Sequence, residues 1–442
     1  MGKKLPSPLA GCRKIGLIGL GISNRGVLSH IRECDGCPEI RTIESIQKTQ
    51  DALCDFSGAD ALVLSPSVRP DALALTRAKA RGVRILTDGE IFFTDTKARC
   101  FAVTGSDGKS TTTAMLAHLL SAALGKEVPA IGNIGQAMTP RLAEDHTDYA
   151  IELSSFQLFH YTPHVARAAI TNLTENHLNW HKGMEEYKRA KAGLYAACEN
   201  PIVSPDGIGA YELLKKQPFA VYSMEKAEKE LAKCKAEFAY YIKNEMVYEN
   251  GAPFLPLSYL KADTSYNRYN LLCALAMAAG IITKESARAI EGFSGLAHRC
   301  RCVLTVRGVR YIDSSIDSSP SRTAKTLGAL DAPVVLLLGG LGKGLSLTPL
   351  LAPVKEKCRG VVCFGPFGRE AAAFLAENGY AGLLPSPTER LAEAFYAASD
   401  IAREGDAVLL SPAATSFDEF ENFEARADAF RALALSLINK SI

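Results

Sequence analysis

One stretch of this sequence, residues 102–113, constrains the fold more than any other. Its first three residues, Ala-Val-Thr, are typical of the end of a buried strand, and the residues from 111 onward have the apolar spacing of a helix. Between them lies the turn 105–110, which reads Gly-Ser-Asp-Gly-Lys-Ser. Its glycines let successive backbone N–H groups and the helix N-terminus point at one anion. The stretch therefore predicts a strand, a loop and a helix that together bind phosphate groups.

The side chains of this turn suit a nucleoside triphosphate. Lys109 can reach the outer phosphates, and the hydroxyl of Ser110 can bind magnesium. Val103 stands where the general GxxxxGK[ST] pattern has its first glycine, so the pattern is matched except at that position. A short GK[ST] turn also arises by chance, and the surrounding strand and helix are what favour the phosphate site. We expect the nucleotide to contact Gly105, Ser106, Asp107, Gly108, Lys109 and Ser110.

The length of the chain and the order of its apolar segments predict an α/β protein of three domains. At 442 residues the chain exceeds one ordinary core. Strand-like runs alternate with helix-length segments before the phosphate turn, around it and after residue 293, which is typical of parallel sheets. We expect a Rossmann-like N-terminal domain over 1–96, a central phosphate-loop ATPase-type domain over 97–292 and a Rossmann-like C-terminal domain over 293–442.

Composition and charge argue against several classes of protein. The hydrophobic fraction of 47% and the charged fraction of 22% are those of a packed globular protein rather than a disordered one. The formal net charge of +2, without long basic runs, argues against a nucleic-acid partner. The sequence has no apolar run of about eighteen residues and no apolar segment near its start. We therefore expect neither a membrane span nor a signal peptide, and a cytoplasmic location.

Two short patterns near the N-terminus leave alternatives open. Cys34 and Cys37 have the CxxC spacing of a metal or redox pair, but no second pair follows at the spacing of a zinc site. Gly19 and Gly21 follow a strand-like run, with Asn24 at the position where a dinucleotide-binding turn has its third glycine. A nucleotide-sized turn between strand and helix fits this pattern better than an NAD site does.

Three further residues are candidates for metal or substrate contacts. Glu152 lies at the end of the apolar run 149–153 and could hold magnesium against the triphosphate. His177 lies among dense polar residues that follow the run 166–172. Lys191 lies on a predicted helix among small residues, which would let its amine approach a shared site. Taken singly, they have plainer interpretations as a surface carboxylate, a structural histidine and a solvated lysine.

Seven motifs along the chain together resemble the Mur ligase family. In order, they are GSDGKSTTT, ELSSFQL, NLTENHLNWH, YKRAK, the pair HR at 298–299, LLLGGLGKG and LLSPAATSFDEFENFEARADAF. The resemblance covers essentially the whole chain. The phosphate turn would fit any Mur ligase, whereas ELSSFQL and the last motif are similar to the members that add D-glutamate.

This resemblance implies an ATP-dependent amide ligase of peptidoglycan precursor synthesis. Its substrates would be UDP-N-acetylmuramoyl-L-alanine, D-glutamate and ATP, with two magnesium ions as cofactors. ATP would phosphorylate the alanyl carboxylate, and the amine of D-glutamate would then displace phosphate from the acyl phosphate. The enzyme would act as a monomer, without nucleic acid and without membrane insertion. A Mur-type ligase with another acceptor amino acid remains an alternative, as does a non-catalytic relative that binds nucleotide or precursor.

The resemblance also implies roles for residues in all three domains. Phosphate and magnesium would be held by Lys109, Ser110 and Thr111. Glu152, His177 and a carbamylated Lys191 would lie on the metal side. These three residues would act in catalysis together with Lys109. The remaining nucleotide contacts would be Asn267, Arg299 and Asp313. The precursor, with its UDP end in the first domain, would contact Gly21, Ile22, Ser23, Ser65, Pro66, Asn133 and His177. D-Glutamate would contact Lys343, Ser416 and Phe423.

Two positions depart from the family pattern. Asp107 replaces an asparagine, which adds negative charge near a polyanion. Ser315 stands where a lysine near the reacting groups is expected. Loss of that cation would cost on the order of 2 to 4 kcal/mol of transition-state stabilisation unless another group replaces it. Arg322, a few residues later, is the candidate replacement.

Overall fold

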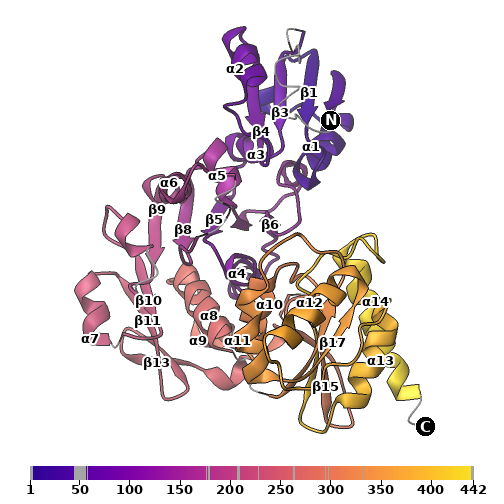
Figure 1. Cartoon of the computed structure of the whole chain (residues 1–442). Helices are drawn as coiled ribbons and strands as arrows, with labels where there is room; N and C mark the ends of the chain where they lie inside the picture. The colour runs from indigo at the N-terminus through magenta and orange to yellow at the C-terminus, as the bar shows by residue number, and fades with distance from the viewer. Residues whose placement is uncertain are drawn as a thin grey trace. The chain divides into compact units, whose positions relative to one another are not determined.

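The structure is a computed structural model of the chain. It describes residues 3–43, 56, 58–175, 177, 180–206, 210–226, 228–261, 264–293, 295–296, 298–330 and 332–439. The chain divides into two compact units, one over residues 1–293 and one over residues 294–442. The first unit contains two sheets and the second unit contains a third (Figure 1). Helices between the strands confirm the α/β class, and the boundaries between the three expected domains stay predictions.

The first sheet has four parallel strands in the order β2-β1-β3-β4. They are β1 (Lys14–Ile18), β2 (Glu39–Ile43), β3 (Ala61–Leu64) and β4 (Arg84–Thr87). The helices of this part are α1 (Ile22–Arg32), α2 (Leu73–Ala80) and α3 (Asp88–Asp95). Because β1 pairs with β3, the turns that follow these two strands lie side by side, and the backbone N–H of Ser65 donates to the oxygen of Ile18 at 2.8 Å.

Asn24 fixes the turn that follows β1. Its side-chain nitrogen donates to the backbone oxygens of Ile18, Gly19 and Val63 at 3.0, 2.8 and 3.0 Å. The side chain is fully buried, so these bonds satisfy the amide nitrogen, which would otherwise be costly to remove from water. The asparagine at the third-glycine position therefore holds strand and helix together.

The CxxC pair has the character of structural thiols. The Cys34 thiol donates to the backbone oxygens of Lys4 and His30 at 3.3 and 3.2 Å, and burial raises its pKa. Cys37 is exposed, and the described cysteines are all free thiols. A thiol of raised pKa is a poor nucleophile and a poor metal ligand, so the structure favours the structural interpretation.

The buried ring of His30 on α1 makes stability depend on pH. Burial, helped by the nearby Lys3, lowers its pKa to about 4, and the side chain is 4% exposed. The unfolded chain takes up this proton near the ordinary histidine pKa, so the stabilisation is present above that value and is lost as pH falls toward 4. Between pH 7 and pH 5 we expect wild type to lose about 2 kcal/mol more unfolding free energy than His30→Gln.

Urea unfolding at the two pH values measures this difference. His164→Gln is the matched control, because the side chain of His164 is 72% exposed and its loss should leave the pH dependence of wild type unchanged. An equal pH dependence for His30→Gln and wild type would show that His30 does not contribute.

The second sheet has nine strands in the order β13-β12-β11-β10-β9-β8-β5-β7-β6. They are β5 (Arg99–Thr104), β6 (Ala130–Gly132), β7 (Asp148–Glu152), β8 (Val165–Ile170), β9 (Cys198–Val203), β10 (Ala220–Ser223), β11 (Phe238–Lys243), β12 (Met246–Glu249) and β13 (Ala252–Pro256). The pairs β11–β12 and β12–β13 are antiparallel and the others are parallel. The helices are α4 (Lys109–Leu124), α5 (Ser155–His160), α6 (Met184–Ala196), α7 (Glu228–Leu231), α8 (Ser265–Ala278) and α9 (Lys284–Ala287).

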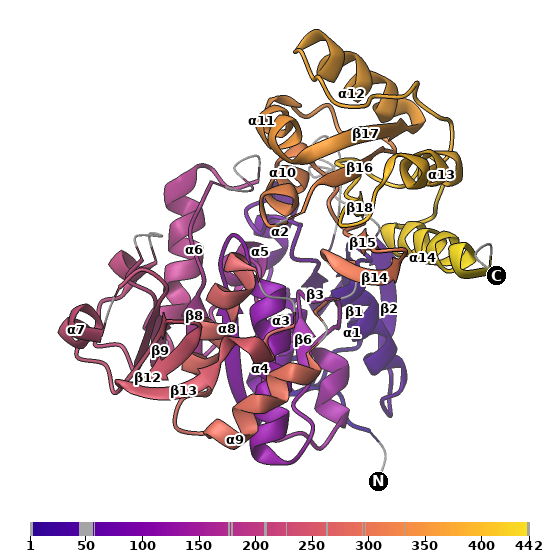
Figure 2. The ribbon, with the colours of Figure 1, turned by 90° about the horizontal axis from the view of Figure 1, so that it is seen from below.

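Two hydrophobic cores cover the faces of this sheet. Helices α4 and α8 pack together in one core and lie side by side (Figure 2), whereas α5 and α6 contribute to the other. Strand β5 lies between β7 and β8 and is buried along nearly its whole length, as expected for the central strand of a parallel sheet. The carboxyl ends of β5, β7 and β8 therefore bring their turns to one edge, where open α/β sheets bind ligands.

The second unit contains a five-stranded sheet in the order β14-β15-β18-β16-β17. Its strands are β14 (Arg301–Val306), β15 (Val309–Asp313), β16 (Val334–Gly339), β17 (Cys358–Phe364) and β18 (Ala407–Leu410). Only the β14–β15 pair of this described sheet is antiparallel. Its helices are α10 (Pro320–Gly328), α11 (Thr348–Lys357), α12 (Gly365–Glu377), α13 (Leu391–Ile401) and α14 (Phe423–Asn439). Within the described part of the chain, no helix combines the length and apolar character that crossing a membrane requires.

Candidate active site

The phosphate turn requires glycine at two points. Gly105 has a φ of 149° and Gly108 a φ of 80°, and residues that carry a Cβ rarely adopt these backbone angles. A Cβ on Gly105 would lie 1.9 Å from Oγ1 of Thr171, and one on Gly108 would lie 2.5 Å from Oδ1 of Asn270. The turn is thus enclosed by the residue that follows β8 and by a polar residue of α8. Asn267, an expected nucleotide contact, lies one helical turn before Asn270.

Polar residues that follow β8 hold the backbone of the turn. The N–H groups of Ser106 and Asp107 donate to the backbone and side-chain oxygens of Asn172, both at 2.9 Å. The hydroxyl of Thr171 donates to the oxygen of Asp107 at 2.6 Å. The hydroxyl of Ser106 faces inward, 2.8 Å from the phenol oxygen of Tyr187. Of the turn residues expected to contact the nucleotide, Ser106 thus uses its hydroxyl to fix the loop.

Lys109, Ser110 and Thr111 form the first turn of α4, which confirms the predicted strand, loop and helix. The ammonium group of Lys109 folds back over the turn and donates to the oxygen of Ser106 at 2.9 Å. The unpaired N–H groups and the dipole at a helix start both favour an anion. This end of α4 therefore presents positive charge at the carboxyl edge of the sheet.

Lys191 is buried against the same turn. Its side chain is 1% exposed, and Nζ donates to Oγ1 of Thr104 at 3.0 Å and to the oxygen of Gly105 at 2.9 Å. Burial lowers the pKa of this amine well below its usual value, and nearby Lys109 lowers it further, while Glu152 acts in the opposite direction. The interpretation of Lys191 as a solvated lysine is therefore wrong. Burial and the neighbouring Lys109 thus favour the neutral amine over the ammonium.

Glu152 ends β7 and is 1% exposed. Its Oε1 accepts a hydrogen bond from Nδ2 of Asn133 at 2.6 Å. Its Oε2 is buried and has no hydrogen-bond partner among the described residues. A buried carboxylate oxygen without a partner costs free energy, and a cation bound beside it would remove that cost. The structure thus brings together Lys109, Glu152 and Lys191, with Asn133 beside them.

The two histidines after β8 differ in environment. His177 is exposed, has a φ of 56°, and lies with its ring 4.8 Å from that of Phe156, between ring centroids. His181 is 2% exposed, and its Nε2 lies 2.9 Å from Oγ of Ser155. His181 was not among the predicted site residues. Its signal in the sequence was the adjacent Trp180, whose ring packs against it, whereas Phe156 and Tyr187 reach it from other segments.

The residues expected to bind the UDP end lie on the adjacent turns after β1 and β3. Ile22 begins α1 and is 60% exposed, between Gly21 and Ser23. Ser65 is 9% exposed, with its hydroxyl 3.3 Å from that of Ser67. The two turns are adjacent, and the contact with UDP stays a prediction.

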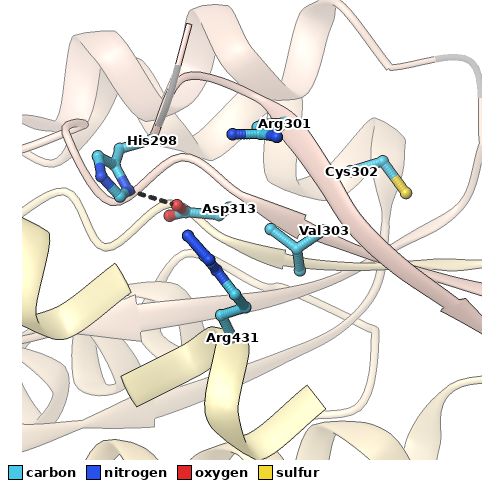
Figure 3. A pocket seen from close by; sticks show the side chains of 6 residues that line it. All are labelled: His298, Arg301, Cys302, Val303, Asp313 and Arg431. Carbon is cyan, nitrogen blue, oxygen red and sulfur yellow. Dashed lines mark hydrogen bonds and ion pairs between the residues drawn. The ribbon is translucent and has the colours of Figure 1, made fainter. Parts of the chain in front are cut away.

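In the second unit, Asp313 forms a buried pair with His298. Oδ2 of Asp313 lies 2.8 Å from Nδ1 of His298 (Figure 3). Oδ1 accepts from the N–H of Ser315 at 2.9 Å. A cavity of about 140 Å³ beside this pair is lined by His298, Arg301, Cys302, Val303, Asp313 and Arg431. In Figure 3, Arg431 extends from its helix toward Asp313, while Cys302 points away. The cavity can hold only part of a nucleotide. Arg299, the expected contact, follows His298 in sequence.

Ser315 is enclosed by the protein. It is fully buried, its hydroxyl accepts from Nε of Arg426 at 3.2 Å, and its backbone oxygen accepts from Nη2 at 2.9 Å. Arg426 also donates to the backbone oxygens of Thr415 and Ala414 at 3.0 and 3.1 Å. This serine is therefore enclosed by a buried arginine, and the effect of having no lysine at position 315 stays a prediction. A signal for Arg426 was present in the sequence, because this arginine lies on the same side of α14 as the buried residues Ala427 and Phe430.

We expect Arg426→Met to destabilise the protein. Burial lowers the pKa of this guanidinium to about 10, yet its loss leaves the buried backbone oxygens of Ser315 and Ala414 without the donor that they have here. The expected loss of unfolding free energy in urea is about 3 kcal/mol. Arg431→Met is the control on the same helix, since Arg431 is 54% exposed and its change should stay within about 0.5 kcal/mol. Equal effects of the two substitutions would contradict this account.

The residues expected to bind D-glutamate are only partly brought together. Lys343 and Ser416 lie on two loops joined by a pair of backbone bonds of 3.0 Å between Leu341 and Thr415. Nζ of Lys343 donates to Oγ of Ser318 at 3.0 Å. Partial burial and nearby Arg322 lower the pKa of Lys343. Phe423 instead packs against His298, with 5.9 Å between ring centroids.

Comparison with known proteins extends these observations to the whole chain. The family described as the Mur ligase middle domain matches residues 103–278. A UDP-N-acetylmuramoylalanine–D-glutamate ligase of Clostridium novyi is 33% identical over 401 residues, covering 89% of this chain and 86% of that protein. The ligase of the same name from Aliivibrio salmonicida is 30% identical over 456 residues, covering 96% of this chain and 97% of that protein.

Solved structures show the same fold. UDP-N-acetylmuramate–alanine ligase MurC of Thermotoga maritima has a TM-score of 0.62 at 19% identity, covering 97% of this chain and all of that one. MurF ligase of Thermotoga maritima in complex with ADP has a TM-score of 0.57 at 12% identity, covering 100% of this chain and 99% of that one. Identities this low show the fold alone, whereas the sequence relatives above cover nearly the whole chain. The protein therefore belongs to the Mur ligase family.

Proposed function

We propose that this protein joins D-glutamate to UDP-N-acetylmuramoyl-L-alanine, with cleavage of ATP to ADP and phosphate, during peptidoglycan precursor synthesis in the cytoplasm. The observation that carries the proposal is the meeting of Lys109, Glu152 and Lys191 at the phosphate turn. Full-length relatives with the D-glutamate ligase name support the choice of substrates. These findings do not favour the non-catalytic alternative, because its only support was the departures at Asp107 and Ser315.

The phosphate turn and the start of α4 bind the triphosphate in this proposal. A free carboxylate is a poor acyl donor, so an oxygen of the alanyl carboxylate attacks the γ-phosphorus and ADP leaves. Lys109 offsets the negative charge that develops on the transferred group. The amine of D-glutamate then attacks the acyl carbon of the mixed anhydride, loses a proton and expels phosphate, which leaves the amide.

Magnesium fits the donors at this edge of the sheet. The unpartnered Oε2 of Glu152 offers an anionic oxygen, and Ser110, the first residue after Lys109, offers a hydroxyl. A neutral Lys191 amine can add carbon dioxide, and the carbamate would supply further oxygens. His177 is the remaining residue proposed for the metal side. Magnesium would neutralise charge on the phosphates. A divalent cation would also balance the acidic Asp107 beside a polyanion.

The acceptor site is assigned to the second unit. D-Glutamate has two carboxylates, and Lys343 and Arg322 supply two cations within electrostatic reach of each other. Ser416 lies on the loop paired with that of Lys343 and offers a hydroxyl. Arg322 is exposed, which suits a ligand contact better than the enclosed Ser315 does. Asp313 and Arg299 remain the proposed nucleotide contacts of this unit. Phe423 packs against His298, the partner of Asp313.

Release of phosphate from ATP tests the proposal. Purified protein is supplied with UDP-N-acetylmuramoyl-L-alanine and with D-glutamate, L-glutamate, D-aspartate, L-lysine or no amino acid. We expect release that requires both the precursor and D-glutamate. Release with a different acceptor would indicate a Mur-type ligase of another specificity. Silence with every acceptor, alongside measurable ATP binding, would favour the non-catalytic alternative.

A further inference from the structure

The loop after β3 contacts aromatic residues from the part of the chain that carries the phosphate turn. The indole Nε1 of Trp180 donates to the backbone oxygen of Ser67 at 2.7 Å. The ring of His160 lies close to the backbone of Pro66 and Val68. The loop that holds two expected precursor contacts is therefore not free to move independently of α5 and the segment before α6.

Arg69, which belongs to the same loop, makes further contacts with this part of the chain. Its guanidinium lies 4.9 Å from the ring centroids of both Phe159 and Trp180, which is cation–π distance. It donates to the backbone oxygen of Trp180 at 2.7 Å. Its two terminal nitrogens donate to both carboxylate oxygens of Glu186 at 3.0 and 3.2 Å, and Asp71 accepts a second pair of bonds. A planar fork is the geometry that a lysine cannot reproduce.

Glu186 carries this contact into α6. Its carboxylate also accepts from the backbone N–H of Lys182 at 2.8 Å, so the start of the helix is held from two sides. The next residue, Tyr187, lies with its ring 4.8 Å from the amine of Lys191 and its hydroxyl 2.8 Å from that of Ser106. The chain of contacts therefore runs from the loop after β3 through α6 to the phosphate turn.

A second branch reaches the end of β7. His181 follows Trp180 and packs against it, with 4.8 Å between ring centroids. It bonds to Ser155, three residues after Glu152, and its Nδ1 lies 3.5 Å from the carboxylate of Glu186. The first branch thus ends at Lys191 and the phosphate turn, and the second ends at Ser155, close in sequence to Glu152.

We propose that Arg69 is a positioning residue of the ligation: it couples the precursor-binding loop after β3 to Lys191 and the phosphate turn through Glu186. The identity of the loop's ligand rests on the proposed function. Binding of the UDP precursor at this loop then aligns α6 for the phosphoryl transfer. Loss of the Arg69 contacts therefore weakens binding of the precursor more than binding of ATP. Arg69 and Glu186 touch neither substrate in this account.

Steady-state kinetics of Arg69→Lys and Glu186→Gln test the coupling. Each keeps a side chain of similar length but loses the paired hydrogen bonds. We expect the KM for UDP-N-acetylmuramoyl-L-alanine to rise about tenfold or more, while the KM for ATP stays within about twofold. Arg369→Lys is the control, because Arg369 makes an exposed ion pair with Glu389 in the other unit. A merely structural role would lower the active fraction and leave both KM values unchanged, which would overturn the proposal.

Tryptophan fluorescence provides a readout that does not need turnover. Trp180 is the single tryptophan of the chain, so its emission reports on this contact alone. Titration of wild type with UDP-N-acetylmuramoyl-L-alanine should change the emission, and Arg69→Lys should need about tenfold more ligand. A fluorescence response without ligation would defeat the proposed function and leave the coupling standing. An unchanged emission over the range in which the precursor saturates ligation, or equal titrations of the two proteins, would overturn the coupling.

Discussion

Replacing Lys109 with alanine is expected to abolish ATP-dependent ligation while leaving the fold intact. The ammonium group lies over the phosphate turn, 2.9 Å from the backbone oxygen of Ser106, at the point where α4 begins. It is the cation best placed to offset charge on the transferred phosphoryl group. Removal of such a group from a site shielded from water should lower the rate on the order of a thousandfold.

Phosphate release and product formation measure this loss, and circular dichroism with thermal unfolding reports on the fold. Lys188→Ala is the matched control, because Lys188 lies on α6 and forms an exposed ion pair with Glu185. We expect that variant to keep the activity of wild type. Turnover of Lys109→Ala within about tenfold of wild type would contradict the assignment of the phosphate turn.

Replacing Lys191 with alanine is expected to lower ligation by about a hundredfold or more, because the site loses the oxygens of the proposed carbamate. Short carboxylic acids such as formate and acetate should restore part of the activity, since their carboxylates can occupy the space left by the longer side chain. The variant should remain folded, because a buried amine of lowered pKa adds little to stability as a cation.

Activity is measured across a concentration series of each acid. The same acids added to wild type and to Lys109→Ala are the controls, and neither should be stimulated. Rescue confined to Lys191→Ala would support an anionic role for this side chain. Failure of every acid at every concentration would leave Lys191 with a structural role, as its bonds to Thr104 and Gly105 alone would suggest.

Local sequence patterns predicted the parts of the fold that depend on local physics. The strand-like runs at 14–18, 61–64, 84–87 and 407–410 match four strands, because buried parallel strands are continuous apolar runs. The phosphate turn was predicted from residue types alone, since glycine, lysine and serine at that spacing have few other uses between a strand and a helix.

Contacts between distant residues could not be predicted in this way. Arg69 and Glu186 are separated by 117 positions, and Arg426 and Ser315 by 111. Periodicity shows which face of a helix is buried but not which residue lies opposite. The burial of Lys191 is of the same kind, because its amine contacts Thr104 and Gly105, which lie 87 and 86 positions away in the sequence.

The central claim is that the alanyl carboxylate is phosphorylated and then joined to D-glutamate. The most direct test uses UDP-N-acetylmuramoyl-L-alanine whose alanyl carboxylate carries oxygen-18, with ATP and D-glutamate. Attack on the γ-phosphorus makes one labelled oxygen the bridge of the mixed anhydride, and that oxygen leaves with phosphate when the amide forms. The account predicts one labelled oxygen per phosphate released and a glutamyl amide as product. Unlabelled phosphate would contradict it.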